Sequence, residues 1–310
     1  MNGVTGFKKH LWPKTTSSLK FIQMKKTEVV LLNALIGISI MLQSTKNFAK
    51  ELTLHEALQK GLINLNLNAS GGHRENCVSL KVQNKGASEL NLVLEPGIIL
   101  DNLNELQQDI IVVKTLKMKL KPHQKLDTAA YGFCCQSTNS SPQKGQKFRL
   151  GKKADSLMVK LCKYIDKHKI APSNAQSAVW TVSNNHKLAT IGAPNDTSIA
   201  ALIKICNERR NESLPWFYVG YSNMPGVVFS NIPCKVVLDF KYTKKTDKQL
   251  TIAIYNKAGH KVKTLLANSY GEAGPKSFHF DFDIVNWDTG KYSLKVKEWE
   301  QEPFVKTFEL

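Results

Sequence analysis

The sequence lacks the short motifs that mark the common classes of enzyme. It contains no His-Glu-x-x-His, no Gly-x-Ser-x-Gly and no Walker loop, which argues against the zinc proteases, α/β-hydrolases and P-loop NTPases that use them. Its six cysteines include no Cys-x-x-Cys pair, and the polar run His73-Arg74-Glu75-Asn76-Cys77 lacks the spacing of metal ligands. We therefore predict no catalytic, cofactor-binding or metal-binding residues, and no cofactor.

Negative charge is also scarce. The chain has 43 lysines and arginines but 25 aspartates and glutamates, which gives a formal net charge of +18. Residues 1–49 contribute +6 of this charge, and the remaining lysines stand mostly on polar faces of predicted strands. There is no Arg-rich run and no aromatic–basic interleaving, so we predict a solvated basic surface and no nucleic-acid partner. Attraction to an acidic outer-membrane surface or polysaccharide is compatible with this charge.

The N-terminal apolar run is too short to span a membrane comfortably. Residues 29–42 follow Met24, Lys25 and Lys26, as in a secretory signal peptide, and fall short of the ~20 residues that a transmembrane helix needs. We expect a signal peptide at residues 24–49. Residues 1–23 are then an extension upstream of the true start, or else a long basic leader. The predicted product passes through the periplasm to the cell surface or medium, associates with the outer membrane, and is not an integral membrane protein after processing.

Residues 50–213 predict an α+β domain in which β-sandwich-like strands precede helices. Strands are expected at residues 78–82, 90–94, 109–113, 116–120 and 129–134, where apolar residues alternate with others. Helices are expected at residues 155–168, 175–182 and 198–209, where apolar residues recur at helical spacing. Thr53 and Glu56 have capping-box spacing, and Ser173 is a second expected cap. Cys162 and Cys206 fall in these helices and are expected to be buried, inert thiols.

An aromatic segment follows at residues 214–228 and is expected to be irregular, as a linker or packing segment. Trp216, Phe217, Tyr218 and Tyr221 make it a candidate contact patch. Tyr and Trp favour such patches because they bury a large area at low entropic cost. The same four side chains would alternatively seal a domain junction.

Residues 229–310 predict an all-β domain of short alternating strands. These strands are expected at residues 236–240, 250–255, 278–282 and 292–296. Gly259 and Gly290 lie in the turns between them, where glycine supplies backbone conformations that β-branched residues disfavour. Tyr292 then enters the core as a large apolar anchor.

Part of this C-terminal segment resembles a known class of domain. The similarity lies in residues 250–262, in Gly271 and Gly274, and in Trp287-Asp288-Thr289-Gly290-Lys291-Tyr292. These residues resemble the C-terminal sorting domains recognised by the type IX secretion system and the related immunoglobulin-like module of flagellar hook-capping proteins. The resemblance implies an immunoglobulin-like sandwich over residues 229–310 that has the secretion machinery as its partner. A plain immunoglobulin-like accessory domain is the alternative.

A second, shorter similarity spans about residues 130–180. Phe133-Cys134 and the later Gln176-Ser177-Ala178-Val179-Trp180 resemble the signature of bacterial surface thioester domains. The resemblance implies that the thiol of Cys134 or Cys135 condenses with the Gln176 carboxamide to form a thioester that captures an amine. The chain departs from that family because Ala175 replaces a threonine, the cysteine is doubled, and the two halves are unusually close in sequence.

A structural explanation of the same residues stands beside the thioester. Ala175, Ala178, Val179 and Trp180 form the apolar side of a predicted helix, and Gln176 lies on its polar side. Cys77 then pairs with Cys134 or Cys135 in a disulfide, which an oxidising compartment permits.

These observations favour an exported, non-catalytic binding or adhesion protein with a C-terminal sorting domain. Its expected partner is a surface polysaccharide or a protein. Two alternatives stay open at this point: a covalent adhesin with a Cys–Gln thioester, and a hydrolase whose site is not recognisable in the sequence.

Overall fold

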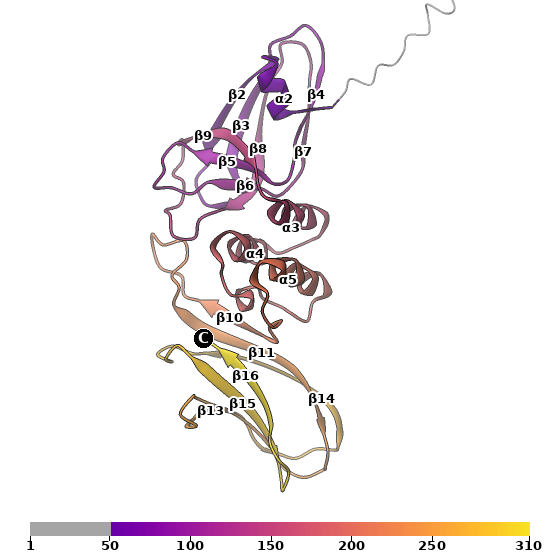
Figure 1. Cartoon of the computed structure of the whole chain (residues 1–310), viewed down its shortest axis with the longest axis vertical. Coiled ribbons are helices and arrows are strands. Elements are labelled where there is room, and N and C mark those ends of the chain that lie inside the picture. The colour runs from indigo at the N-terminus through magenta and orange to yellow at the C-terminus, as the bar shows by residue number, and fades with distance from the viewer. Residues whose placement is uncertain (1–50) are drawn as a thin grey trace, which may run out of the picture. The chain divides into compact units, whose positions relative to one another are not determined.

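β-Strands dominate the computed structural model, which describes residues 51–310 (Figure 1). In the first part of the chain the elements are β1 (Leu52–Thr53), α2 (Leu54–Gln59), β2 (Ile63–Ala69), β3 (Arg74–Asn84), β4 (Leu90–Leu94), β5 (Ile98–Asn102), β6 (Ile110–Val112), β7 (Leu116–Leu120), β8 (Lys125–Cys134), β9 (Lys147–Lys153), α3 (Ser156–Lys167), α4 (Pro172–Asn184), the 3-10 helix η1 (Leu188–Thr190) and α5 (Thr197–Arg210). We call this part the barrel region. The predicted signal peptide and upstream extension lie outside the described residues.

The second part of the chain contains only strands. They are β10 (Phe217–Tyr221), β11 (Pro233–Lys244), β12 (Leu250–Tyr255), β13 (Lys261–Ser269), β14 (Gly274–Asp283), β15 (Lys291–Glu298) and β16 (Phe304–Glu309). We call these strands the C-terminal sheets. Both parts belong to one compact unit.

Six strands of the barrel region close into a barrel, in the order β2-β3-β8-β6-β5-β9. Closure depends on β9, which pairs with β2 where Phe148 faces Leu67 and with β5 where Leu150 faces Leu100. The β-sandwich predicted for residues 50–213 is therefore wrong, because these strands form a barrel. β2, β5 and β9 were not expected as strands, and the Lys- and Arg-rich β9 conceals its apolar positions. A closed barrel leaves none of its six strands as a free edge.

Close backbone approach inside the barrel requires a glycine on β8. Gly132 lies opposite Val112 of β6. A Cβ atom built on Gly132 would lie 2.5 Å from the Ile111 carbonyl oxygen and 2.6 Å from Ile110 Cγ2. No side chain fits at that separation, so this position fixes how closely β6 and β8 can pack.

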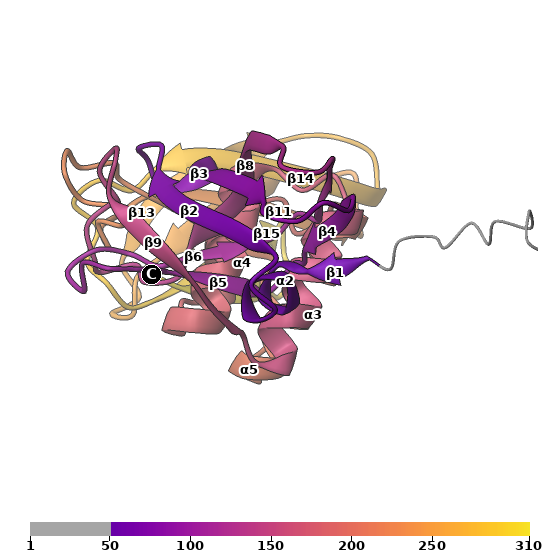
Figure 2. The same cartoon turned by 90° about the horizontal axis from the view of Figure 1, so that it is seen from above.

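A second sheet, β1-β4-β7, adjoins the barrel and leads into α2. Both hydrogen bonds of the predicted capping box are present, from Glu56 N to Thr53 Oγ1 at 3.2 Å and from Thr53 N to Glu56 Oε2 at 2.8 Å. Leu54 and Ala57 of α2 are buried. Figure 2 shows α2 directly beside β1. The predicted helix start is confirmed.

Helices α3, α4 and α5 pack against one another and against the barrel (Figure 1). Their buried apolar residues share a hydrophobic cluster with Ile111 and Phe133 of the barrel strands, except for Trp180 of α4, which belongs to the barrel cluster. Cys162 and Cys206 are fully buried there, as expected. The predicted Ser173 cap is wrong, since α4 begins at Pro172 and follows Ala171. Proline is favoured at the first helical position because the N–H it lacks has no partner there.

The C-terminal sheets consist of two antiparallel sheets, β10-β11-β14 and β13-β12-β15-β16. Both sheets contribute to one hydrophobic cluster rich in aromatic side chains. The expectation of an irregular segment at residues 214–228 is wrong for Phe217–Tyr221, which form β10 with Val219 opposite Val236. Aromatic residues at consecutive positions obscure the period of two in this strand. These residues therefore belong to the C-terminal sheets.

The barrel region meets the C-terminal sheets through η1. This short helix contacts β10, and its residue Ala189 belongs to the hydrophobic cluster of the C-terminal sheets. Lys187, just before η1, forms an ion pair of 3.5 Å with Glu309. The contact brings the end of α4 close to β10 and to the segment that follows it.

Candidate binding groove

The two halves of the thioester-like motif meet in the structure. Gln176 of α4 donates its Nε2–H to the Cys134 carbonyl at 3.0 Å and accepts from Cys134 N at 3.2 Å through Oε1. The Gln176 side chain thus binds the backbone at the end of β8 as a neighbouring strand would. Since Gln176 is 3 % exposed, the contact also satisfies its own buried amide.

The doubled cysteines face two different cores. Cys134 belongs to the barrel cluster together with Cys77, whereas Cys135 packs against the helix cluster. Burial raises the pKa of the Cys77 thiol to about 12, and burial, with the nearby Cys77, raises that of Cys134. Burial also raises the pKa of Cys135 well above its usual value. All three thiols are free, so the predicted disulfide among them is not formed in this structure. Their protonated state disfavours nucleophilic attack.

The predicted aromatic contact patch is divided between two environments. Trp216 donates its indole N–H to the Thr307 carbonyl at 3.0 Å, and the Lys306 ammonium lies 4.4 Å from the centre of its ring. Phe217 packs against Phe308 with ring centroids 5.6 Å apart. These two rings cover the core of the C-terminal sheets. Tyr218 and Tyr221 instead line a cavity beside α4.

This cavity, which we call the α4 groove, has a volume of about 310 Å³. One wall is helix α4, which contributes Ser173, Gln176, Ser177 and Trp180, and the opposite wall is the segment from Tyr218 to Ser230. His73 and Arg74 line it from the start of β3. The four α4 residues have the spacing i, i+3, i+4 and i+7, which places them on one face of the helix.

The chemistry of the α4 groove is that of hydrogen-bond donors and aromatic rings. Arg74 is exposed at its edge, and no Asp or Glu is among the described residues that line it. Burial, aided by the Arg74 guanidinium, lowers the pKa of His73, which favours the neutral imidazole. Burial raises the pKa values of Tyr218 and Tyr221, so both hydroxyls stay protonated at neutral pH.

Trp180, which lines this groove, carries a buried donor that has no partner among the described residues. It is 5 % exposed, and within residues 51–310 no group accepts a hydrogen bond from its indole N–H. Its ring packs against His186 and Phe229, with centroids 5.7 and 5.6 Å away, and those two rings also contact each other at 4.3 Å. A buried polar group without a partner costs about 1–3 kcal/mol, so a ligand acceptor that reaches this N–H would recover that free energy.

A neighbouring cavity of about 580 Å³ shares Thr190, Tyr221 and Phe229 with the α4 groove. His186 lines it and forms a hydrogen bond of 2.9 Å between Nε2 and Ser137 Oγ. Burial, with a smaller effect of the Arg210 charge, lowers the pKa of His186 to about 4. The imidazole is therefore neutral at neutral pH. The cavity is also lined by the positively charged Lys187, which is paired with Glu309.

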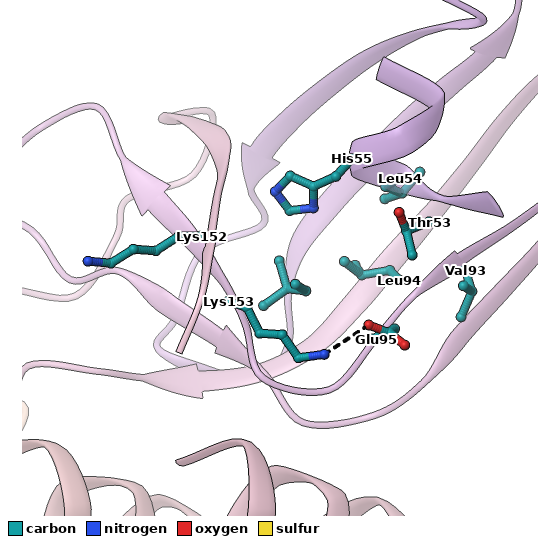
Figure 3. A pocket seen from close by; sticks show the side chains of 9 residues that line it. Thr53, Leu54, His55, Val93, Leu94, Glu95, Lys152 and Lys153 are labelled. Atoms are coloured by element: carbon teal, nitrogen blue, oxygen red, sulfur yellow. Dashed lines mark hydrogen bonds and ion pairs between the residues drawn. The ribbon is translucent and has the colours of Figure 1, made fainter. Parts of the chain in front are cut away.

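A third cavity, of about 320 Å³, lies at α2 and is shown in Figure 3. His55 approaches it from α2, but its Nε2 is already 2.7 Å from the Gly151 carbonyl oxygen. Lys153 points to Glu95 and forms an ion pair of 3.2 Å (Figure 3). Because these polar groups already have partners, the cavity is a weaker candidate than the α4 groove.

Comparisons with protein-family models, curated proteins and solved structures found no match. Among residues 51–310, no helix has the length and apolar character needed to cross a membrane. Nor does this range contain a group of three or more His, Cys, Asp or Glu side chains arranged to hold a metal ion. The functional assignment therefore rests on the groove itself.

Sequence reasoning identified parts of this groove without joining them. In the sequence, Gln176 and Trp180 belong to a motif, Tyr218 and Tyr221 to an aromatic patch, and His73 and Arg74 to a polar run. The i, i+3, i+4, i+7 spacing of the α4 residues could have shown that they share a face. The opposite wall could not be found in this way, because it comes from the segment after β10.

Proposed function

We propose that this protein is exported and acts as a non-catalytic binding module, with the α4 groove as its recognition site. The observation that carries the proposal is the buried, unpartnered indole N–H of Trp180 at a groove lined by Tyr218 and Tyr221. Small-ligand sites combine aromatic or apolar walls with a few placed polar groups, and such groups set orientation and specificity.

The C-terminal sheets are, in this proposal, an immunoglobulin-like sandwich used for sorting or attachment. Two antiparallel sheets that share one aromatic core are compatible with that fold. The turn sequences around Gly259 and Gly290 and the final apolar strand support the resemblance to type IX sorting domains. The proposed location is the cell surface or the medium, reached through the periplasm.

The sorting role is tested by fractionating cells that possess a type IX machinery. A reporter carrying residues 1–49 at its front and residues 214–310 at its end includes β10, so both C-terminal sheets are complete. We expect this reporter at the cell surface or in the medium, and in the periplasm when the machinery is inactivated. Equal retention in the periplasm of both strains would contradict the sorting role.

The recognition role is tested by attachment. The full chain is expected to bind the surface of the cells that display it, and substitutions in the α4 groove are expected to reduce this binding. Attachment that is insensitive to every groove substitution would show that the groove is not the recognition site.

A second candidate function, the covalent adhesin, is favoured by the direct contact between Gln176 and Cys134. In that reaction the thiol sulfur of Cys134 would bond to the Gln176 amide carbon, and the amide nitrogen would leave as ammonia with the thiol proton. The protonated, buried thiol opposes this step, as does the use of both Gln176 polar atoms by the Cys134 backbone. An intact mass lower by one ammonia, restored by methylamine, would establish the thioester, and an unchanged mass would remove it.

A further inference from the structure

The α4 groove carries one charged side chain at its edge and no opposing acid, which points to an anionic ligand. Arg74 forms no ion pair with any residue of the range 51–310. A guanidinium binds a carboxylate through two parallel hydrogen bonds, which gives both strength and orientation. His73 beside it is neutral and can add a hydrogen bond without adding charge.

The remaining lining suits a molecule that has hydroxyl groups and an apolar face. Ser173, Ser177 and Asn223 offer short polar side chains, and the Trp180 indole N–H offers a donor fixed by its buried ring. Tyr218 and Tyr221 are half-buried and contribute aromatic surface. A sugar ring has both a C–H face that packs on aromatic rings and a rim of hydroxyls that accept from such donors.

We propose that the α4 groove binds a carboxylated sugar unit of an acidic polysaccharide, with the carboxylate on Arg74 and a ring oxygen or hydroxyl on the Trp180 N–H. This inference rests on the proposed binding function and names its class of partner. A cavity of about 310 Å³ is at the small end of ligand sites, so it accommodates one or two sugar rings of a longer chain. The basic net charge of the chain favours encounter with such a polymer.

The test is a calorimetric titration of the full chain with a galacturonate trisaccharide and with its carboxyl-reduced counterpart, which has the same rings but no charge. We expect the charged trisaccharide to bind at least about tenfold more tightly, because a charge-assisted hydrogen-bond pair is lost in the reduced one. Equal binding of the two sugars, or no binding of either, would overturn the proposal.

Two variants and their controls locate the binding. Arg74→Gln is expected to weaken binding of the charged trisaccharide about tenfold and to leave the reduced sugar unaffected. Trp180→Phe removes the N–H and keeps an aromatic ring, so it is expected to weaken binding of the charged trisaccharide severalfold. Arg209→Gln and Trp299→Phe are matched controls that do not line the groove, and both are expected to bind as the unaltered chain does.

A nuclear magnetic resonance measurement on the unaltered chain keeps the test decisive if Trp180→Phe does not fold. The Trp180 indole N–H resonance is expected to shift when the charged trisaccharide is added, and that of Trp299, which is 53 % exposed, is expected to stay in place. An unmoved Trp180 resonance would mean that the N–H serves an ordered water or nothing, and would overturn the proposal.

The remaining outcomes separate this inference from the proposed function. If poly-glutamate binds with the same dependence on Arg74 and Trp180 while the trisaccharide does not, the partner is an acidic peptide and the sugar is wrong. The binding function would then stand. If neither probe binds and attachment to cells ignores the groove variants, both the sugar and the proposed recognition role fail.

Discussion

The barrel region and the C-terminal sheets bury different kinds of polar side chain. The buried polar residues of the barrel region are all neutral: Asn84, Asn102, Gln107, Gln108, Ser137, Gln176, Thr181 and Thr190. Those of the C-terminal sheets are both charged, namely Lys244 and Glu298. Buried side chains can thus hold loops in place in two ways: by neutral amides and hydroxyls in the barrel region, and by charged groups in the C-terminal sheets.

Asn84 is an example of the neutral kind. Its amide donates to the Ser88 carbonyl at 2.7 Å and the Lys121 carbonyl at 3.0 Å, and it accepts from Gly86 N at 2.9 Å. It thereby holds the turn after β3 against the end of β7. Because an amide does not titrate, this contact should be independent of pH.

Glu298 is the charged counterpart at the end of β15. Its carboxylate accepts hydrogen bonds from Tyr242 Oη at 2.6 Å, Lys245 N at 2.8 Å and Thr246 N at 3.0 Å. Burial alone would raise the pKa of Glu298, but these hydrogen bonds outweigh burial and hold it below the usual value. The turn between β11 and β12 therefore depends on an ionised group.

The largest expected effect tests the close packing of β8 against β6 in the barrel. Gly132→Ala would place a Cβ atom 2.5 Å from a backbone oxygen, so the variant is expected to lose about 3 kcal/mol of unfolding free energy. Gly271→Ala is the matched control in the C-terminal sheets, because no atom lies within 4 Å of its added Cβ. Chemical denaturation measures both. A stability for Gly132→Ala close to that of the unaltered chain would show that β6 and β8 can separate enough to admit a methyl group.

Removal of the buried charge is expected to be the next largest effect. Glu298→Gln keeps the shape but replaces one acceptor oxygen with a donor group, which leaves at least one of the four donors to this carboxylate unpaired. We expect a loss of about 2–3 kcal/mol, measured by chemical denaturation at neutral pH. Glu302→Gln, at an exposed position nearby, should change stability little. A similarly small change for Glu298→Gln would contradict the role given to the carboxylate.

Asn84→Ala tests the neutral counterpart. The variant leaves the Gly86 N–H and two carbonyls without their partner, and is expected to lose about 2 kcal/mol of unfolding free energy. Its loss should be the same at pH 5 and pH 8, whereas the loss for Glu298→Gln should shrink once the medium is acidic enough to protonate the native carboxylate. Chemical denaturation of both variants from pH 8 down to acidic pH measures whether the two losses differ in their pH dependence. Parallel pH profiles would break the comparison between the two regions.

As the pH falls, the barrel region should lose stability before the C-terminal sheets do, because of His186. The unfolded imidazole takes up a proton below its ordinary pKa of 6.5, but the folded one resists protonation until about 4. The His186 contribution to stability is therefore complete above pH 6.5 and is lost as the pH falls toward 4. The lowered pKa of Glu298 places its own loss at more acidic pH. His186→Gln should remove the first of these two pH dependences and Glu298→Gln the second. Melting temperatures of both variants measured across pH test this.

The smallest expected effect concerns an exposed ion pair. Lys119 lies 3.0 Å from Glu89, and the two side chains are 68 % and 39 % exposed. Lys119→Ala should cost less than about 0.5 kcal/mol, because solvent screens such pairs. A loss as large as that of Glu298→Gln would show that exposed charges stabilise this protein as much as buried ones do.

Several local features were predictable because their signal lies in neighbouring residues. The capping box of Thr53 and Glu56, the strands Leu116–Leu120 and Leu250–Tyr255, and the buried faces of α3 and α5 follow from spacing alone. β9 was missed because four of its seven residues are lysine or arginine and conceal the two that face inward. The start of α4 was misplaced because Ser173 gives a stronger local cap signal than Ala171.

The candidate site was predictable only in pieces. A period of 3.6 residues already puts Ser173, Gln176, Ser177 and Trp180 together, but no spacing rule links them to Tyr218 or Arg74. Likewise, the motif could bring Gln176 to Cys134 but could not say that the amide would bind the backbone there. Orientation of this kind depends on how α4 packs against the end of β8.

By itself the sequence determined which segments are strands or helices in most places, and where the charge and the aromatic residues lie. Those properties depend on short-range burial patterns and on residues a few positions apart. The tertiary structure alone decided that β9 closes a barrel, that β10 joins the C-terminal sheets, and that Trp180 faces the segment after β10. These outcomes require pairing between residues far apart in the chain, where many partners are locally equivalent and only the packed whole selects one.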